Sequence, residues 1–104
     1  MPFQLSMAKA TMNYTYVLLS EADDRLDIGA TADLRKRLKL LADDQVRSTV
    51  YRRPMLLIYY EAGLSADDAY RRERFLKTGK GGRYLKKRLA SSLSELRKKK
   101  LERH

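Results

Sequence analysis

The side chains available for chemistry in this sequence are carboxylates, phenols and guanidinium groups. The chain has no cysteine, and its single histidine is the last residue, His104. The absence of cysteine excludes a thiol nucleophile, a disulfide framework and a zinc finger. A lone histidine at the final position argues against histidine-based catalysis. The candidates that remain are one glutamate, one arginine and two tyrosines, each of which stands out by its position.

Glu73 shares one face of a predicted helix with Ala66, Ala69 and Leu76. A carboxylate within an apolar stripe costs desolvation free energy unless a cation, a hydrogen bond or a metal ion compensates for it. An ion pair with one of the many arginines would satisfy Glu73 without any function. Metal binding is the functional alternative.

Arg37 follows Leu34 by three residues and precedes Leu41 by four. Its aliphatic stem is therefore expected at the edge of the apolar stripe of another helix. Tyr14 and Tyr16 alternate along a predicted strand and so point to the same face, where tyrosines more often pack than react.

Three strands are predicted to position these residues. Residues 14–19 and 25–28 are rich in aromatic and aliphatic side chains and are separated by a polar stretch, which is typical of a β-hairpin. Gly29 is expected to end the second strand. The apolar run 55–61 follows Pro54 and predicts a buried third strand.

Three helices are predicted between and after the strands. Thr31 is expected to cap a helix that runs to about Leu41, and the capping box that starts at Ser65 opens a helix to about Lys77. We expect the glycines that follow, Gly79, Gly81 and Gly82, to close this second helix. A last helix is predicted over residues 84–101, with leucines along one side.

The order of elements predicts an α+β fold, with a small three-stranded mixed or antiparallel sheet flanked by helices. A length of 104 residues suits one domain. We expect this domain to span residues 14–89, after a flexible extension over 1–13 and before a basic helical tail over 90–104.

The charge of the chain points to a polyanionic partner. Twenty-three Lys and Arg oppose 13 Asp and Glu, and residues 83–104 alone hold nine basic and two acidic residues, a net charge of +7. Such an excess most often serves nucleic-acid binding. The longest apolar run, residues 55–60, is far below the ~20 residues of a membrane span. The first 12 residues lack a secretory pattern. We therefore expect a cytoplasmic protein with no membrane partner.

Six short motifs follow one another along the chain. They are Tyr14-Thr-Tyr-Val-Leu18, Leu26-Asp-Ile-Gly29, Thr31-Ala-Asp-Leu-Arg-Lys-Arg-Leu38, Ser48-Thr-Val-Tyr-Arg-Arg-Pro54, Tyr59-Tyr-Glu-Ala62 and Arg72-Glu-Arg-Phe-Leu-Lys77. In this order they resemble the GIY-YIG nuclease superfamily, in particular its small single-domain bacterial branch. The resemblance covers about Tyr14 to Leu89, and this region is similar to the nuclease domain found in bacterial excision repair.

The resemblance implies a metal-dependent endonuclease that hydrolyses DNA phosphodiester bonds with Mg²⁺ or Mn²⁺. By motif position, Tyr16 would help to deprotonate the attacking water, Arg37 would stabilise phosphate charge, and Glu73 would bind the metal ion. The basic residues expected at the nucleic-acid backbone are Arg35, Lys36, Arg52, Arg53, Lys77, Lys80, Arg83, Lys86 and Lys87.

The sequence departs from the family pattern at the second signature motif, where Asp27 replaces a catalytic tyrosine. The change removes a phenol and adds a negative charge that repels phosphate, unless the aspartate serves as an additional metal ligand. Leu41 replaces a histidine or tyrosine of many members, and Ala30 replaces a lysine of some. Loss of one group from a cooperative site commonly costs orders of magnitude in rate, so impaired activity is expected.

Two other functions fit the same sequence. One is a nucleic-acid-binding module that keeps the fold without turnover. The other is a basic RNA-binding or ribosome-associated protein, which the charge alone favours. In the nuclease hypothesis, a protein partner could supply targeting, and the sequence gives no indication of the oligomeric state.

Overall fold

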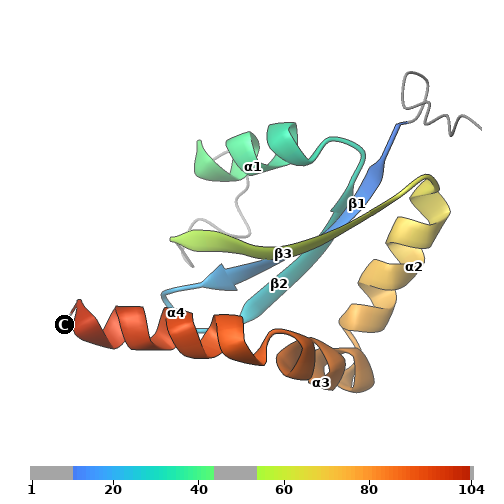
Figure 1. Ribbon diagram of the computed structural model, residues 1–104. Coiled ribbons are helices and arrows are strands. Elements are labelled where there is room, and N and C mark those ends of the chain that lie inside the picture. Colours follow the sequence, from blue (N-terminus) through green and yellow to red (C-terminus); the bar gives the residue numbers. More distant parts are fainter. Residues whose placement is uncertain (1–10, 44–53, 104) are drawn as a thin grey trace, which may run out of the picture.

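The computed structural model describes residues 11–43 and 54–103, which form one antiparallel sheet and four helices (Figure 1). The strand order is β2-β1-β3. This arrangement confirms the predicted α+β fold and the antiparallel alternative for the sheet. The elements are β1 (Asn13–Ser20), β2 (Leu26–Thr31), α1 (Leu34–Ala42), β3 (Met55–Gly63), α2 (Ala66–Leu76), α3 (Gly79–Arg88) and α4 (Ala90–Glu102).

The sheet separates two hydrophobic clusters. Successive side chains of β1 point to opposite faces. Val17 packs with Leu76 and Leu85 beneath α2 and α3, whereas Tyr16 and Leu18 pack against the helix α1. β1 is the central strand, and helices pack on both of its faces, so residues 15–20 are all buried. The helices α1 and α2 therefore cover opposite faces (Figure 1).

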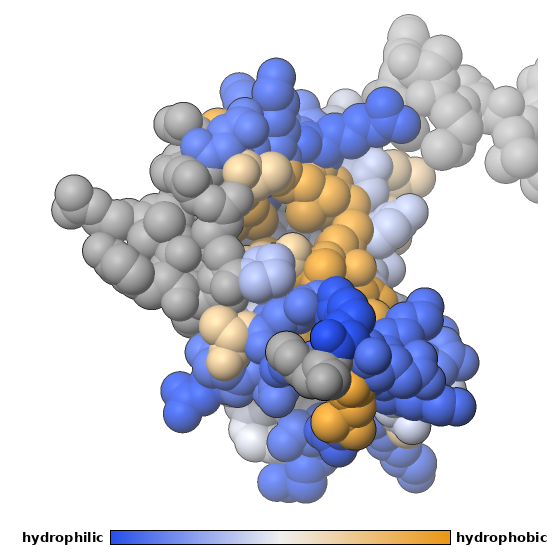
Figure 2. Space-filling view, turned by 90° about the vertical axis from the view of Figure 1, so that its left-hand side faces the viewer, coloured by the Kyte–Doolittle hydropathy of each residue, from blue (hydrophilic) through white to orange (hydrophobic). Residues whose placement is uncertain are grey.

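The surface shows the same layering. Figure 2 shows an apolar band between two hydrophilic layers. A groove of ≈ 540 Å³ between α1 and the start of β3 is lined by Leu38, Leu41 and Met55, among others. Leu41 is 8% exposed and belongs to the core cluster that contains Tyr16 and Leu18.

The start of α1 differs from the prediction. Asp33, not Thr31, is the N-cap, and its carboxylate accepts a hydrogen bond of 3.0 Å from the Lys36 amide. Thr31 ends β2, and its hydroxyl accepts a hydrogen bond from the Asp33 amide. The predicted cap of α2 is confirmed, because the Ser65 hydroxyl accepts from the Asp68 amide.

The glycines after α2 do not close that helix. Thr78 caps α3, which begins at Gly79. A Cβ at Gly81 would overlap the carbonyl of Phe75 and the Cα of Leu76, so glycine permits the close approach of α3 to the end of α2.

The predicted single helix over 84–101 is also wrong, because α3 ends at Arg88 and α4 begins at Ala90, with Leu89 between them. The Leu89 backbone leaves helical geometry (φ −109°, ψ 19°) while its side chain stays buried. The break directs α4 past the turn between β1 and β2.

Some predictions fall outside the described residues. Arg52, Arg53 and the first ten residues are among them, as is most of the motif before Pro54. Within the described ranges, no helix is both long enough and apolar enough to cross a membrane.

Candidate active site

Tyr16 and Arg37 meet on the face of the sheet that α1 covers. The Arg37 Nε donates a hydrogen bond of 2.9 Å to the Tyr16 hydroxyl oxygen. Tyr16 is only 4% exposed, and Arg37 is partly buried, as expected for the edge of the α1 stripe. The structure thus brings together two of the three residues assigned to catalysis or metal binding by motif position.

Gly29 provides the space for this pair. It lies opposite Tyr16 in the β1–β2 register and inside β2, which continues to Thr31, so the predicted end of the strand at Gly29 is wrong. A Cβ at Gly29 would overlap the hydroxyl and ring of Tyr16. The Tyr16 ring therefore lies directly over the backbone of the edge strand.

We expect Gly29→Ala to displace the Tyr16 ring and to break its hydrogen bond to Arg37. Overpacking of this kind costs roughly 1–3 kcal/mol, measurable as a lower free energy of unfolding in urea. Gly63→Ala is the matched control, because a Cβ at Gly63 meets nothing within 4 Å. Equal stability of the two variants would contradict the geometry described for Gly29.

Asp27 lies on the same face of the sheet as Tyr16. It pairs with Leu18 in the register, two residues before Gly29, and successive residues of a strand alternate between faces. Asp27 therefore shares a face with Tyr16 and lies on β2, the strand over which the Tyr16–Arg37 pair lies.

Glu73 lies on α2, which packs against β1 and β2 from the other face. Its side chain is 20% exposed, and its Oε2 is 2.8 Å from the Lys77 Nζ. The sequence predicts an arginine as the pairing cation, whereas the structure shows a lysine one turn along the helix. Among the described residues, no hydrogen bond or ion pair links Glu73 to Tyr16 or Arg37. The Tyr16–Arg37 pair and the helix that carries Glu73 instead lie against opposite faces of β2.

The donor set restricts the kind of metal ion that the chain could hold. The described segments contain no group of three or more Asp, Glu, His or Cys residues arranged to bind a metal. Mg²⁺ is commonly held by one or two carboxylates, with water and substrate phosphate as the other ligands. The partly exposed carboxylate of Glu73 fits that mode and does not fit an all-protein cage.

The described basic residues predicted to bind nucleic acid form two groups. Arg35 and Lys36 are exposed on α1, near the Tyr16–Arg37 pair, and the larger group lies on α3 or just before it. Lys77 is engaged with Glu73. The other members of the larger group are Lys80, Arg83, Lys86 and Lys87, and all four are exposed.

An ionic network that sequence reasoning missed holds α2 against β3. The Arg72 Nε and Nη2 donate to both Glu61 carboxylate oxygens at 2.8–3.0 Å, and the Tyr59 hydroxyl donates to Glu61 at 3.1 Å. The Arg72 guanidinium also lies 4.9 Å from the ring centroid of Tyr84. Both residues of the ion pair occur in the motifs, but no local pattern connects positions 61 and 72.

The network also shifts two pKa values. The hydrogen bond to Glu61 raises the pKa of Arg72, and burial together with the bond to Glu61 raises the pKa of Tyr59. The Tyr59 hydroxyl therefore remains a donor at neutral pH. Since Glu73 follows Arg72 on α2, the network fixes the helix that carries the candidate metal ligand.

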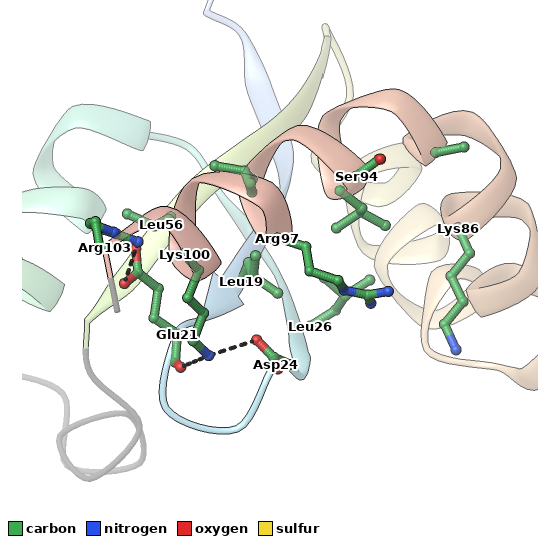
Figure 3. Close-up of a pocket in the computed structure, with 13 residues that line it drawn as sticks. Leu19, Glu21, Asp24, Leu26, Leu56, Lys86, Ser94, Arg97, Lys100 and Arg103 are labelled. Carbon is green, nitrogen blue, oxygen red and sulfur yellow. Dashed lines mark hydrogen bonds and ion pairs between the residues drawn. The ribbon is translucent and has the colours of Figure 1, made fainter.

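The tail helix α4 is held against the turn between β1 and β2. The Lys100 Nζ donates to the Glu21 carbonyl at 2.6 Å and to the Asp24 carboxylate at 3.1 Å, and Arg103 pairs with Glu21 at 3.2 Å. Figure 3 shows these contacts beside a groove of ≈ 470 Å³ with an apolar floor that includes Leu19 and Leu26. Two cations of the basic tail thus make ion pairs within the molecule.

The family model described as the GIY-YIG catalytic domain matches residues 12–88, the region that contains the sheet, α2 and the Tyr16–Arg37 pair. The chain belongs to the GIY-YIG family. The match confirms the resemblance and indicates a nuclease-type function, and nucleases of this family act on DNA and generally depend on divalent metal ions. No curated protein and no solved structure matched the chain. The similarity to the excision-repair nuclease domain therefore stays a prediction.

Within this GIY-YIG domain, Tyr16 and Gly29, the residues that the resemblance assigns to the two signature motifs, contact each other across neighbouring strands. The two motifs are thus parts of one structural unit, to which α1 adds Arg37.

Proposed function

We propose that the protein is a divalent-metal-dependent endonuclease that hydrolyses DNA phosphodiester bonds. The observation that carries the proposal is the hydrogen bond from Arg37 to Tyr16, formed over Gly29 within a GIY-YIG domain. A guanidinium fixed by a phenol, beside a strand at the edge of the sheet, suits the recognition of a phosphate group.

Each residue has a distinct role in the proposed reaction. Arg37 donates hydrogen bonds to the phosphate oxygens as negative charge develops in the transition state. Tyr16, oriented by Arg37, helps to remove the proton of the attacking water. Glu73 would hold the metal ion, which when bound neutralises phosphate charge and activates the water.

The position of β2 supports this assignment. β2 is an edge strand, with Arg37 bonded to Tyr16 on one face and the helix of Glu73 on the other. A DNA backbone that follows this edge would reach both faces at once. In such a complex the phosphate would lie between Arg37 and Glu73, and Lys77 would exchange its carboxylate partner for the DNA backbone.

Asp27 favours a second candidate, a DNA-binding module without turnover. A carboxylate on this strand opposes the approach of a phosphate, and the phenol that the family places there is missing. This alternative predicts salt-dependent binding with no cleavage, since phosphate contacts release counterions. A marked preference for structured RNA over DNA at the same salt concentration would favour the RNA-binding alternative.

We expect Glu73→Gln to reduce cleavage by at least about 100-fold, because the amide loses the charge that holds the metal ion. The measurement is the single-turnover rate on labelled duplex, nicked and branched DNA with Mg²⁺ or Mn²⁺. Glu95→Gln, at an exposed position of α4, is the matched control and should cleave at the unaltered rate. Unchanged cleavage by Glu73→Gln would refute the assignment of the metal ligand.

A further inference from the structure

Two tyrosines lie beside the candidate site without being part of it. Tyr60 is the direct partner of Tyr16 in the β1–β3 register, so both side chains leave the same face of the sheet. The Tyr60 ring is 53% exposed, and the Tyr14 ring packs edge-on against it, with a centroid distance of 5.9 Å and an angle of 64°. Tyr14 thus supports one side of Tyr60, a residue that stays more than half exposed.

These rings line a hollow that also contains a cation. The hollow has a volume of ≈ 390 Å³, and its lining includes Tyr14, Tyr60, Leu34 and the exposed Arg35. The acidic group in the lining is Asp33, whose carboxylate already accepts the Lys36 amide as the cap of α1. The hollow therefore combines an aromatic face, an apolar wall and a guanidinium.

We propose that Tyr60 is a stacking platform for an unpaired base of the DNA substrate, with Arg35 on the adjoining phosphate. An aromatic ring beside a cation is the combination by which proteins bind single strands, because every base has a face to stack and every nucleotide carries a phosphate. A base inside a continuous duplex has both faces occupied by its neighbours and cannot use the platform.

This inference rests on the proposed function and specifies its substrate class. Tyr60 is on β3, two strand spacings of ~4.8 Å from β2, over which Arg37 contacts Tyr16, so a base on Tyr60 would be within a few nucleotides of a phosphate at Arg37. The preferred substrate is therefore DNA with unpaired nucleotides near the cleaved bond, such as a gap, a flap or a branch point.

The platform can be tested by binding alone. A gapped duplex with 2-aminopurine in its unpaired stretch is titrated with the protein in EDTA, and the quenching of 2-aminopurine fluorescence reports stacking. We expect Tyr60→Ala to weaken binding of this DNA by about 5- to 100-fold and to abolish the quenching. Tyr60→Phe should retain both, because it keeps the ring.

The matched control is Tyr70→Ala, which removes a ring of similar exposure (50%) from α2. It should bind the gapped DNA like the unaltered protein, and none of the variants should change binding to a continuous duplex by more than about twofold. Equal losses on gapped and continuous DNA, or no loss with Tyr60→Ala, would overturn the platform. So would tighter binding of a single-stranded RNA of the same sequence than of the DNA.

Failure of the platform is distinguishable from failure of the proposed nuclease. If the unaltered protein cleaves DNA but Tyr60→Ala does not change binding, the platform is overturned and the nuclease assignment stays intact. Quenching that depends on Tyr60, in a protein that cleaves no DNA with Mg²⁺ or Mn²⁺, would support the platform and refute the nuclease.

Discussion

Arg37→Ala is expected to lower the single-turnover rate of DNA cleavage by about 100- to 1000-fold, the usual effect of removing one fixed donor to a charged transition state. The variant also leaves the buried Tyr16 hydroxyl without the hydrogen bond that it accepts from the Arg37 Nε–H. Both effects act on the reacting phosphate and on the water beside it, and so reduce the rate more than the binding.

Arg37→Lys separates charge from geometry in the same assay. Lysine keeps the positive charge but lacks the planar fork of the guanidinium, so we expect it to recover only a small part of the rate. Thermal unfolding of each variant provides the check on folding. A rate for Arg37→Ala within threefold of the unaltered protein, on DNA that it still binds, would contradict the role assigned to this residue.

Asp27→Tyr is expected to raise the rate of cleavage by about tenfold or more. The substitution restores a phenol at the second signature motif and removes a negative charge from the strand beside the phosphate. The rate is measured with Mg²⁺ at saturating protein, so that improved binding does not enter the comparison.

Asp27→Asn is the companion variant, because it removes the charge without adding a phenol. We expect it to give a smaller rise than Asp27→Tyr, and the difference measures what the phenol contributes. A fall in rate with both variants would show that Asp27 itself takes part in the reaction, as an additional metal ligand would.

The strands and the start of α2 were predictable because their signals are local. Clustered aromatic and aliphatic residues marked β1 and β3, and Ser65 with Asp68 marked the start of α2. At the start of α1, the predicted cap Thr31 was wrong, because β2 continues to Thr31 and the helix begins only after Asp33. At Gly81, the close approach of two helices accounts for a glycine that local rules assign to a helix end.

The candidate site was predictable in part, through motif position. The edge placement of Arg37 on α1 followed from helical spacing, but its bond to Tyr16 depends on the tertiary fold. The Glu61–Arg72 ion pair joins two elements with no repeating pattern between them, and the exposure of Tyr60 depends on what covers each face of the sheet. Alternation along β3 places Tyr59 and Tyr60 on opposite faces, but it does not decide which of the two is the exposed one.

The most direct test of the central claim is cleavage of end-labelled gapped and branched DNA by the unaltered protein, in Mg²⁺ and in EDTA. The proposed site predicts strand cleavage in Mg²⁺ and none in EDTA. Salt-dependent binding without cleavage in Mg²⁺ or Mn²⁺ would contradict the nuclease and identify the protein as a binding module of the GIY-YIG fold.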